Sequence, residues 1–336
     1  MRKKHGKRFG VEGLEERWTP ALTVAGGGSA DIIVYGKPNG AVEINQTANG
    51  TFEIYDNAVL VSTKTTATRD LIVKLGSTND DVTIDLGGFT APDDVQVLLG
   101  AGNDSLTVLN GSVFDDLLIS GSGGDDVVDL GDGVNPLEAD DLSINLWTAG
   151  VDEATIHDLV SINDDFYSYY VNTLTLEAGS EIGDDLVIIG GTAGNDVVLD
   201  GNVGHDLKFY GSSRSYAIDT FTQGATSTIG HDAILYTDNS AYLSVGGSDA
   251  VVLSGTVGNY LFINAAGGSD SVELTGTFSI TNPTGRMRIY LGNGDDSFTT
   301  DATLPAGLTG TVDGGTGTDT KDENVALPPG ITDPNF

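Results

Sequence analysis

The chain has 336 residues, of which 47 are glycine and none is cysteine, and its formal net charge is −34. The lack of cysteine excludes disulfides and thiolate metal sites, and the negative charge excludes nucleic acid as a partner, because phosphates would be repelled. No apolar run approaches the ~18 residues of a membrane-spanning helix, while a hydrophobic content of 39% is enough for a packed core.

The N-terminal segment, residues 1–25, differs from the rest of the chain. It begins MRKKHGKRFG, a basic start typical of export signals, but no apolar stretch follows. The next residues, VEGLEERWTPA, resemble the short N-terminal signature of large secreted proteins from planctomycete bacteria. The matching positions are Leu14, Glu15, Arg17, Pro20 and Ala21. The resemblance implies export to the cell surface or the extracellular space, and an ordinary amphipathic N-terminus is the alternative.

Residues 26–326 repeat a glycine turn of the form G-x-G-x-D-x-U, in which U is apolar. The marker aspartates are Asp31, Asp56, Asp80, Asp104, Asp125, Asp152, Asp196, Asp249, Asp270, Asp296 and Asp319. Most of them follow one another at a nearly constant spacing of roughly 24 residues, which lies in the range of solenoid repeats. The two longer intervals are close to twice this period, and degenerate units around Thr173 and around Phe221 fill them.

Short runs between the turns alternate apolar and polar residues, for example at 71–75 and 82–86, as β-strands do. A repeat of roughly 24 residues with two or three such strands has the size of one coil of a right-handed parallel β-helix. The sequence therefore predicts an all-β solenoid of about 12 coils. A β-sandwich, or two of them, is the alternative, since short strands at regular spacing suit that fold as well.

Two segments depart from the repeat. Residues 41–56 predict a β-hairpin around Asn49-Gly50, which would cap the exposed strand edges at the N-terminal end of the solenoid. The proline-rich residues 327–336 predict an extended or disordered tail.

The glycine turns resemble the haemolysin-type (RTX) repeat G-G-x-G-x-D-x-U-x, in which turn carbonyls and the Asp carboxylate bind calcium. The resemblance implies calcium as a cofactor with these ligands: Gly100, Gly102, Asp104, Gly121, Gly123, Asp125, Gly194, Asp196, Asp270, Gly292, Gly294, Asp296, Gly315, Gly317 and Asp319. RTX repeats are tandem nonapeptides, whereas here a single turn occurs in each much longer repeat, so the two-sided RTX roll is not expected. In the last turn Lys321 also replaces the apolar residue.

Stacked coils would place the marker aspartates in one row, with Asp104 and Asp125 as neighbours. Like charges about 5 Å apart repel by roughly 1 kcal/mol per pair in water, and a hard cation with oxygen ligands would reverse that repulsion. The alternative is that these aspartates face water and cap their own turns.

A second acidic row shares the same period. Its members are Asp70, Asp94, Asp116, Asp141, Asp165, Asp185, Asp206 and Asp232. Two of them follow a histidine, in His205-Asp206 and His231-Asp232, about one coil apart. The two imidazoles can therefore stack, either as a pair of transition-metal ligands or as ordinary residues at the start of a strand.

No HExxH, GxSxG or phosphate-loop motif is present. Arg286 and Arg288 are the only close basic pair after Ala21. On a strand they share one face, where they can hold a uronate, as the basic residues of β-helix polysaccharide lyases do, or offset nearby acidic groups. Tyr167 and its neighbours Tyr169 and Tyr170 can stack on a sugar or pack against the coil.

We therefore predict a secreted or surface-displayed structural rod, adhesin-like and stabilised by calcium. The alternatives are a β-helix protein that binds or degrades polysaccharide, and one domain of a larger surface protein. Besides calcium, the expected partner is a polysaccharide or protein of the cell surface or matrix.

Overall fold

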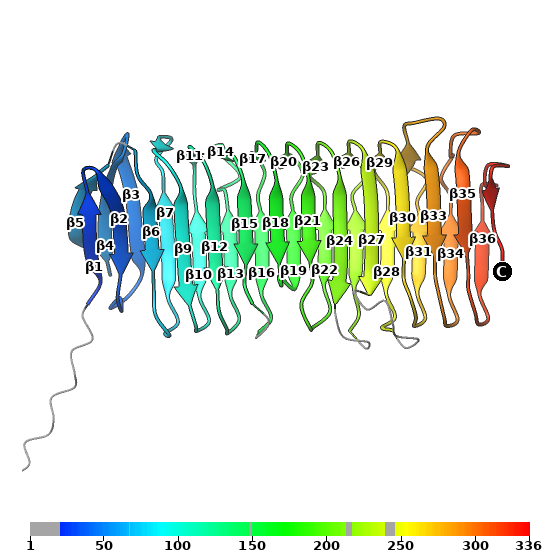
Figure 1. Ribbon diagram of the computed structural model, residues 1–336, viewed down its shortest axis with the longest axis horizontal. Helices are drawn as coiled ribbons and strands as arrows, with labels where there is room; N and C mark the ends of the chain where they lie inside the picture. The colour runs from blue at the N-terminus through cyan, green and yellow to red at the C-terminus, as the bar shows by residue number, and fades with distance from the viewer. Residues whose placement is uncertain (1–20, 67, 148–149, 213–216, 239–245) are drawn as a thin grey trace, which may run out of the picture.

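The computed structural model describes residues 21–66, 68–147, 150–212, 217–238 and 246–336 (Figure 1). Nearly all of the predicted export segment therefore lies outside the described residues. Within the described residues the regular structure consists of β-strands alone. The strands stack as successive coils of a rod, with long parallel ladders. The chain is thus a parallel β-solenoid and not a β-sandwich.

Sheet 1 runs the length of the rod and is parallel after its first antiparallel pair. Its 14 strands, in spatial order, are β1 (Thr23–Gly27), β2 (Ala30–Tyr35), β6 (Leu71–Lys74), β9 (Val95–Gly100), β12 (Leu117–Gly121), β15 (Leu142–Asn145), β18 (Phe166–Tyr169), β21 (Leu186–Ile189), β24 (Leu207–Ser212), β27 (Asp232–Asp238), β30 (Tyr260–Asn264), β33 (Arg286–Tyr290), β35 (Thr309–Asp313) and β37 (Ile331–Thr332).

Sheet 2 is equally long and begins with an antiparallel meander of three strands. Its 14 strands are β5 (Val59–Thr65), β4 (Thr51–Asp56), β3 (Val42–Ala48), β7 (Asp81–Asp85), β10 (Ser105–Val108), β13 (Val127–Leu130), β16 (Glu153–Ile156), β19 (Thr173–Leu176), β22 (Asp196–Leu199), β25 (Thr220–Gln223), β28 (Ala250–Leu253), β31 (Ser271–Leu274), β34 (Ser297–Thr300) and β36 (Thr320–Glu323).

Sheet 3 is shorter and has nine strands of two or three residues. They are β8 (Thr90–Ala91), β11 (Gly111–Val113), β14 (Leu137–Ala139), β17 (Val160–Ile162), β20 (Glu181–Ile182), β23 (Asn202–Val203), β26 (Thr228–Ile229), β29 (Thr256–Val257) and β32 (Ser279–Ile280). Nine coils therefore contribute a strand to every sheet. The first turns form antiparallel hairpins instead, and the last turns lack a strand in sheet 3.

The register of sheet 1 gives the coil length. Leu71 lies beside Val95, Val95 beside Leu117, and the same row continues to Ile331. One coil therefore takes about 24 residues on average, which confirms the predicted period. The two degenerate units are also confirmed, because β19 and β25 take their places in sheet 2.

Inward and outward side chains alternate along most strands. In β9, for example, Val95, Val97 and Leu99 are buried while Gln96 is half-buried. The inward side chains of successive coils form one continuous hydrophobic core. Equivalent residues of stacked coils are ~4.8 Å apart, so each apolar side chain packs on a neighbour above and below.

The two ends of the rod differ from its middle. The hairpin of β3 and β4 is present over the predicted residues and is extended by β5. Where the sequence favours a disordered tail from residue 327, the structure has β37 paired with β35, and Ile331 is buried. Ile331, in register with the stacked row, and Leu327 pack against the core and dock this segment.

Candidate functional site

A row of Asp and Asn residues occupies the turns between sheet 1 and sheet 2, and we call it the inner ladder. Each member is the residue directly before a strand of sheet 2. The members are Asp80, Asp104, Asp126, Asp152, Asn172, Asn195, Asp219, Asp249, Asp270, Asp296 and Asp319. All of them except the last, Asp319, are buried.

The side chains of the inner ladder bind the backbone of the preceding coil. The Asp80 N–H donates to Oδ1 of Asp104 (2.8 Å), and the Asp104 N–H donates to Oδ1 of Asp126 (3.0 Å). The same bond recurs along most of the rod, at 2.7 to 3.0 Å. These residues therefore cap turns, but each caps the turn of its neighbour and links two coils.

Burial leaves the second oxygen of many ladder carboxylates without a partner. Among the described residues this holds for Oδ2 of Asp80, Asp104, Asp126, Asp270 and Asp296. Burial raises the pKa of Asp104 to about 6 and that of Asp270 to about 8, although a backbone N–H bond opposes the shift. The N–H bonds and the raised pKa values both act against the repulsion that the sequence predicts, and calcium at these turns stays a prediction.

Two predicted ligands lie one residue away from the inner ladder. The neighbour of Asp104 is Asp126, whereas the Asp125 N–H donates to Oδ1 of Asn103 (3.1 Å) in a separate, exposed row. Likewise Asp196 is an exposed strand residue beside the buried Asn195. The prediction that Asp104 and Asp125 are neighbours was wrong because the doublet Asp125-Asp126 offers two aspartates at nearly the same spacing.

The predicted glycines lie where one coil touches the next. A Cβ on Gly102 would lie 2.6 Å from the Thr78 backbone, and one on Gly294 would lie 1.4 Å from the Gly268 carbonyl oxygen. Both glycines have positive φ, 137° and 149°. Close stacking therefore accounts for these glycines without a metal. The other predicted glycines in contact with a neighbouring coil or with a ladder side chain are Gly100, Gly121, Gly194, Gly292, Gly315 and Gly317.

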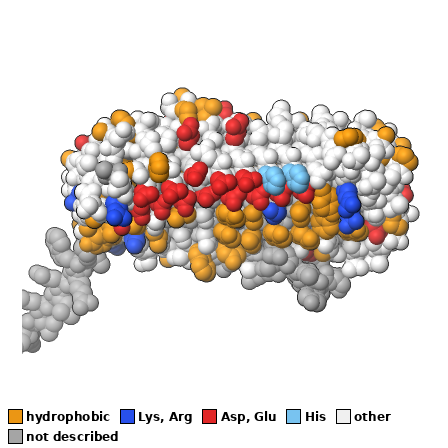
Figure 2. Space-filling model, turned by 45° about the horizontal axis from the view of Figure 1, so that its top comes forward, with side chains coloured by type: hydrophobic (Ala, Val, Ile, Leu, Met, Phe, Trp, Pro, Cys, Tyr) orange, Lys and Arg blue, Asp and Glu red, His pale blue; other side chains and the backbone are white. Residues whose placement is uncertain are grey.

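A second row of carboxylates runs along the surface, and we call it the acidic row (Figure 2). Its members directly precede or begin strands of sheet 1: Asp94, Asp116, Asp141, Asp165, Asp185, Asp206 and Asp232. The Asp165 N–H donates to Oδ1 of Asp141 (2.9 Å), and the same bond recurs elsewhere in the row at 3.1 to 3.3 Å. Here the later coil donates to the earlier one, the reverse of the inner ladder. The predicted first member, Asp70, is joined to Asp94 through the Gln96 amide.

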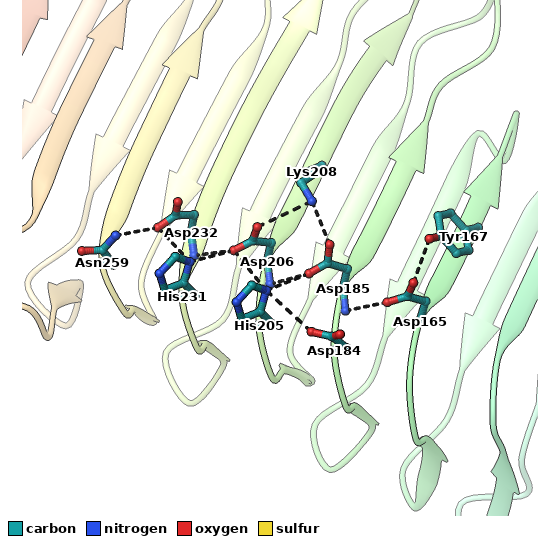
Figure 3. A network of polar contacts seen from close by, with 10 residues as sticks. All are labelled: Asp165, Tyr167, Asp184, Asp185, His205, Asp206, Lys208, His231, Asp232 and Asn259. Carbon is teal, nitrogen blue, oxygen red and sulfur yellow. Dashed lines mark hydrogen bonds and ion pairs between the residues drawn. The ribbon is translucent and has the colours of Figure 1, made fainter.

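Near the middle of the rod, histidines and a lysine join the acidic row (Figure 3). The rings of His205 and His231 stack at 4.8 Å with an interplanar angle of 1°, which confirms the predicted stacking. Their Nδ1 atoms lie 3.0 Å from carboxylate oxygens of Asp185 and Asp206, respectively. Lys208 Nζ contacts both carboxylates, at 2.8 and 3.5 Å. The imidazoles thus alternate with carboxylates as an ion-pairing network.

This network perturbs the pKa values of its members. The hydrogen bond to Asp185 raises the pKa of His205, with the charge of Asp206 acting in the same direction. Burial alone would raise the pKa of Asp185. The hydrogen bonds from Lys208 and His205 outweigh burial, so that this pKa is lowered. Outside the network the described residues form no ion pair with the row. Burial, with the charges of Asp115 and Asp94, raises the pKa of Asp116 to about 6.

Aromatic side chains lie beside the acidic row on the outward face of sheet 1, where Figure 2 shows a hydrophobic patch. The rings of Tyr210 and Tyr236 are stacked at 5.5 Å and 6°. Phe262 follows at 5.1 Å from Tyr236, and Tyr290 at 6.0 Å from Phe262. Sequence analysis missed these residues, although Tyr210, Tyr236 and Tyr290 at one repeat position were an available signal. In the coil between Tyr236 and Tyr290, Asn264 occupies that position and Phe262 lies two residues before it.

The aromatic residues that the sequence singled out lie in two different places. Tyr167 and Tyr169 stack at 6.4 Å on the outward face of β18, and the Tyr167 hydroxyl donates to Asp165 (2.8 Å). Tyr170 lies beyond the strand with a φ of 65° and contacts Trp147 at 6.4 Å.

Towards the C-terminal end, the residues in line with the acidic row are no longer negatively charged. In sheet 1 Asp232 lies beside Tyr260, and Tyr260 lies beside Arg286. Arg286 and Arg288 are both exposed on the same face of β33, as predicted. Within the described residues neither arginine forms an ion pair, although the charge of Arg288 opposes the burial that raises the pKa of Tyr260. Both positive charges are therefore available to an anionic ligand.

In the part of the chain that the structure describes, no helix has the length and apolarity needed to cross a membrane. Comparison of the chain with protein families, curated proteins and solved structures gives no match. The function is therefore inferred from the acidic row, the aromatic side chains and the two arginines.

Proposed function

We propose that the protein is an adhesin-like structural rod, displayed outside the cell, that holds a polysaccharide along the outward face of sheet 1. The observation that carries the proposal is the acidic row lying beside stacked aromatic side chains over consecutive coils. Carboxylates accept hydrogen bonds from sugar hydroxyls, and aromatic rings offer an apolar face on which a sugar ring packs. A surface that repeats with every coil suits a ligand that is itself a repeating polymer.

The charge of the surface selects among polysaccharides. A row of carboxylates on a chain of net charge −34 repels a polyuronate at long range and attracts a cationic polymer. We therefore expect the acidic row to favour an uncharged or amino-sugar polysaccharide. Arg286 and Arg288, at the end of the face, suit one isolated anionic group.

The test is retention of the full chain on immobilised cellulose, chitosan and polygalacturonate. We expect binding to chitosan or cellulose and little to polygalacturonate. Replacing acidic-row residues, as in Asp141→Asn with Asp165→Asn, should weaken chitosan binding tenfold or more. Replacing stacked rings, as in Tyr210→Ala with Tyr236→Ala, should weaken cellulose binding.

The matched control places the same charge change on another face. Asp81→Asn with Glu153→Gln alters exposed residues of sheet 2 and should bind like the wild type. If neither sheet 1 variant loses affinity relative to this control, polysaccharide binding on sheet 1 is contradicted.

A second candidate is a polysaccharide-degrading enzyme, and it is favoured by Arg286 and Arg288, which form no ion pair with the described residues and lie beside Tyr260. Incubation with polygalacturonate and alginate would then release unsaturated or reducing sugar ends. Arg288→Ala would abolish that release. Binding without any release supports the structural rod.

A further inference from the structure

A cluster of three carboxylates lies inside the rod, away from the acidic row. Asp219 and Asp249 are successive members of the inner ladder, and Asp238 is the last residue of β27 in sheet 1. One oxygen of each lies within 4.8 Å of the other two. All three residues are buried, Asp238 with a relative exposure of 5%. At this level of the rod, Asp238 adds a carboxylate from sheet 1 to the two ladder carboxylates.

The hydrogen bonds divide unequally among the three carboxylates. Asp219 accepts backbone N–H groups from Asn195 (2.7 Å) and Ser212 (2.8 Å). Asp249 accepts the Asp219 N–H (2.8 Å) and the Thr237 hydroxyl (2.6 Å).

Asp238 has no such partners, because among the described residues neither of its buried oxygens accepts a hydrogen bond. A buried carboxylate without a partner is strongly unfavourable unless something compensates it. The described ion pairs bring no Lys, Arg or His to the cluster. Since the described residues supply no compensating group, the candidates are a bound cation and protons.

We propose that Asp219, Asp238 and Asp249 bind one calcium ion inside the rod. Calcium takes oxygen ligands at about 2.3–2.6 Å with flexible geometry, so oxygens up to 4.8 Å apart can lie around one ion. Magnesium needs ligands at about 2.0–2.1 Å in a strict octahedron and keeps several waters, which suits this buried site less well.

This site differs from the turn sites that the RTX resemblance implies, because its distinguishing ligand comes from a strand end of sheet 1. It does not depend on polysaccharide binding. Its role is structural, since it joins β27 to the turns before β25 and β28.

The competing account is protonation. Burial, with the charge of Asp249 added, raises the pKa of both Asp219 and Asp238 to about 7. Without a cation the cluster would therefore hold protons near neutral pH. If calcium is bound, removing the Asp238 charge should abolish the calcium-dependent rise in melting temperature. If protons compensate the cluster, removing that charge should not change the response to calcium.

The experiment uses the full chain freed of metal with EDTA at pH 7.5. Calcium chloride is then added in isothermal titration calorimetry and in thermal melts, with magnesium chloride as the comparison. The variants are Asp238→Asn, which keeps the side-chain volume, and Asp81→Asn as the control, since Asp81 is an exposed residue of sheet 2 that lies outside the cluster and is not a predicted turn ligand.

We expect the wild type and Asp81→Asn to bind calcium at one saturable site and to melt at higher temperature with calcium than with magnesium. Asp238→Asn should bind at least tenfold more weakly and show no calcium-dependent shift. If Asp238→Asn does not fold, Asp219→Asn replaces it. A wild type indifferent to calcium overturns the proposal in favour of protons, and so does an Asp238→Asn variant that responds to calcium like the wild type.

Discussion

The inner ladder and the acidic row use the same bond in opposite directions and in different surroundings. In both, a backbone N–H of one coil donates to an aspartate of the neighbouring coil, as in Asp80 to Asp104 and Asp165 to Asp141. The inner ladder is buried except for Asp319. The acidic row is partly exposed and is joined by histidines and Lys208.

The difference shows that aspartates serve different roles depending on whether they are buried or exposed. A buried carboxylate that links two coils contributes to stability, because its loss leaves an N–H group unpaired away from water. An exposed carboxylate can exchange its partners with water and ligands, so it contributes little to stability. We therefore expect stability to depend on the inner ladder and ligand contact to depend on the acidic row.

The largest expected effect is the loss of a ladder carboxylate. Asp104→Ala removes the acceptor of the Asp80 N–H and should lower the free energy of unfolding by about 1–3 kcal/mol, measured by guanidinium denaturation. Asp125→Ala, which removes the exposed acceptor of the Val151 N–H, should cost less than about 1 kcal/mol because water replaces it. Equal losses in the two variants would contradict the comparison.

The pH dependence of stability should also come from the buried carboxylates. The folded pKa of Asp270 is about 8, above its ordinary value of 3.8, so between these values the folded state binds more protons than the unfolded state. Its contribution to stability is complete below about pH 4 and is lost as the pH rises towards 8.

Denaturation midpoints measured from pH 4 to 9 test this sign. The wild type should become less stable across that window, and Asp270→Asn should show a flatter profile because it cannot ionise. Identical profiles for the two proteins would show that Asp270 is ionised in the fold.

The acidic row should have a smaller effect on stability, of the opposite sign and dependent on salt. Replacing three neighbours, Asp94, Asp116 and Asp141, by Asn keeps an oxygen acceptor and removes like charges. The melting temperature should rise in low salt, by an amount equivalent to about 1 kcal/mol. The gain should vanish in 1 M NaCl, where the screening length is about 3 Å. A gain that persists in high salt would indicate a packing effect.

The smallest expected effect is confined to the histidine network. Because Asp185 raises the pKa of His205, Asp185→Asn should lower that pKa, as followed by NMR titration of the imidazole. Asp81→Asn, on sheet 2, serves as the control and should leave it unchanged. An unchanged His205 pKa in Asp185→Asn would show that the hydrogen bond is not formed in solution.

Much of the fold could be predicted from sequence because every coil must superpose on the next. That requirement makes glycine turns and aspartates recur once in every coil, and it placed Asp104 correctly. Side-chain position within a turn could not be predicted so well. A doublet such as Asp125-Asp126 hides which residue faces inward, and the inner ladder continues through Asn172 and Asn195, which a count of aspartates omits.

The carboxylate cluster inside the rod could not be predicted, for a different reason. Asp238 has no counterpart in the neighbouring repeats, and only the fold brings it beside Asp219 and Asp249. The aromatic rings of sheet 1 are an intermediate case, since their repeat positions are visible once the register is known. Periodicity thus reveals what all coils share and misses what one coil does alone.

The most direct test compares the polysaccharide affinity of one variant from each row. Asp141→Asn with Asp165→Asn alters the acidic row, and Asp104→Asn alters the inner ladder while keeping its oxygen acceptor. The affinity for chitosan, measured by calorimetry at low salt, should fall at least tenfold for the acidic-row variant and stay at the wild-type value for Asp104→Asn. Unchanged affinity of the acidic-row variant, or equal losses in both variants, would contradict the division of tasks between the two rows.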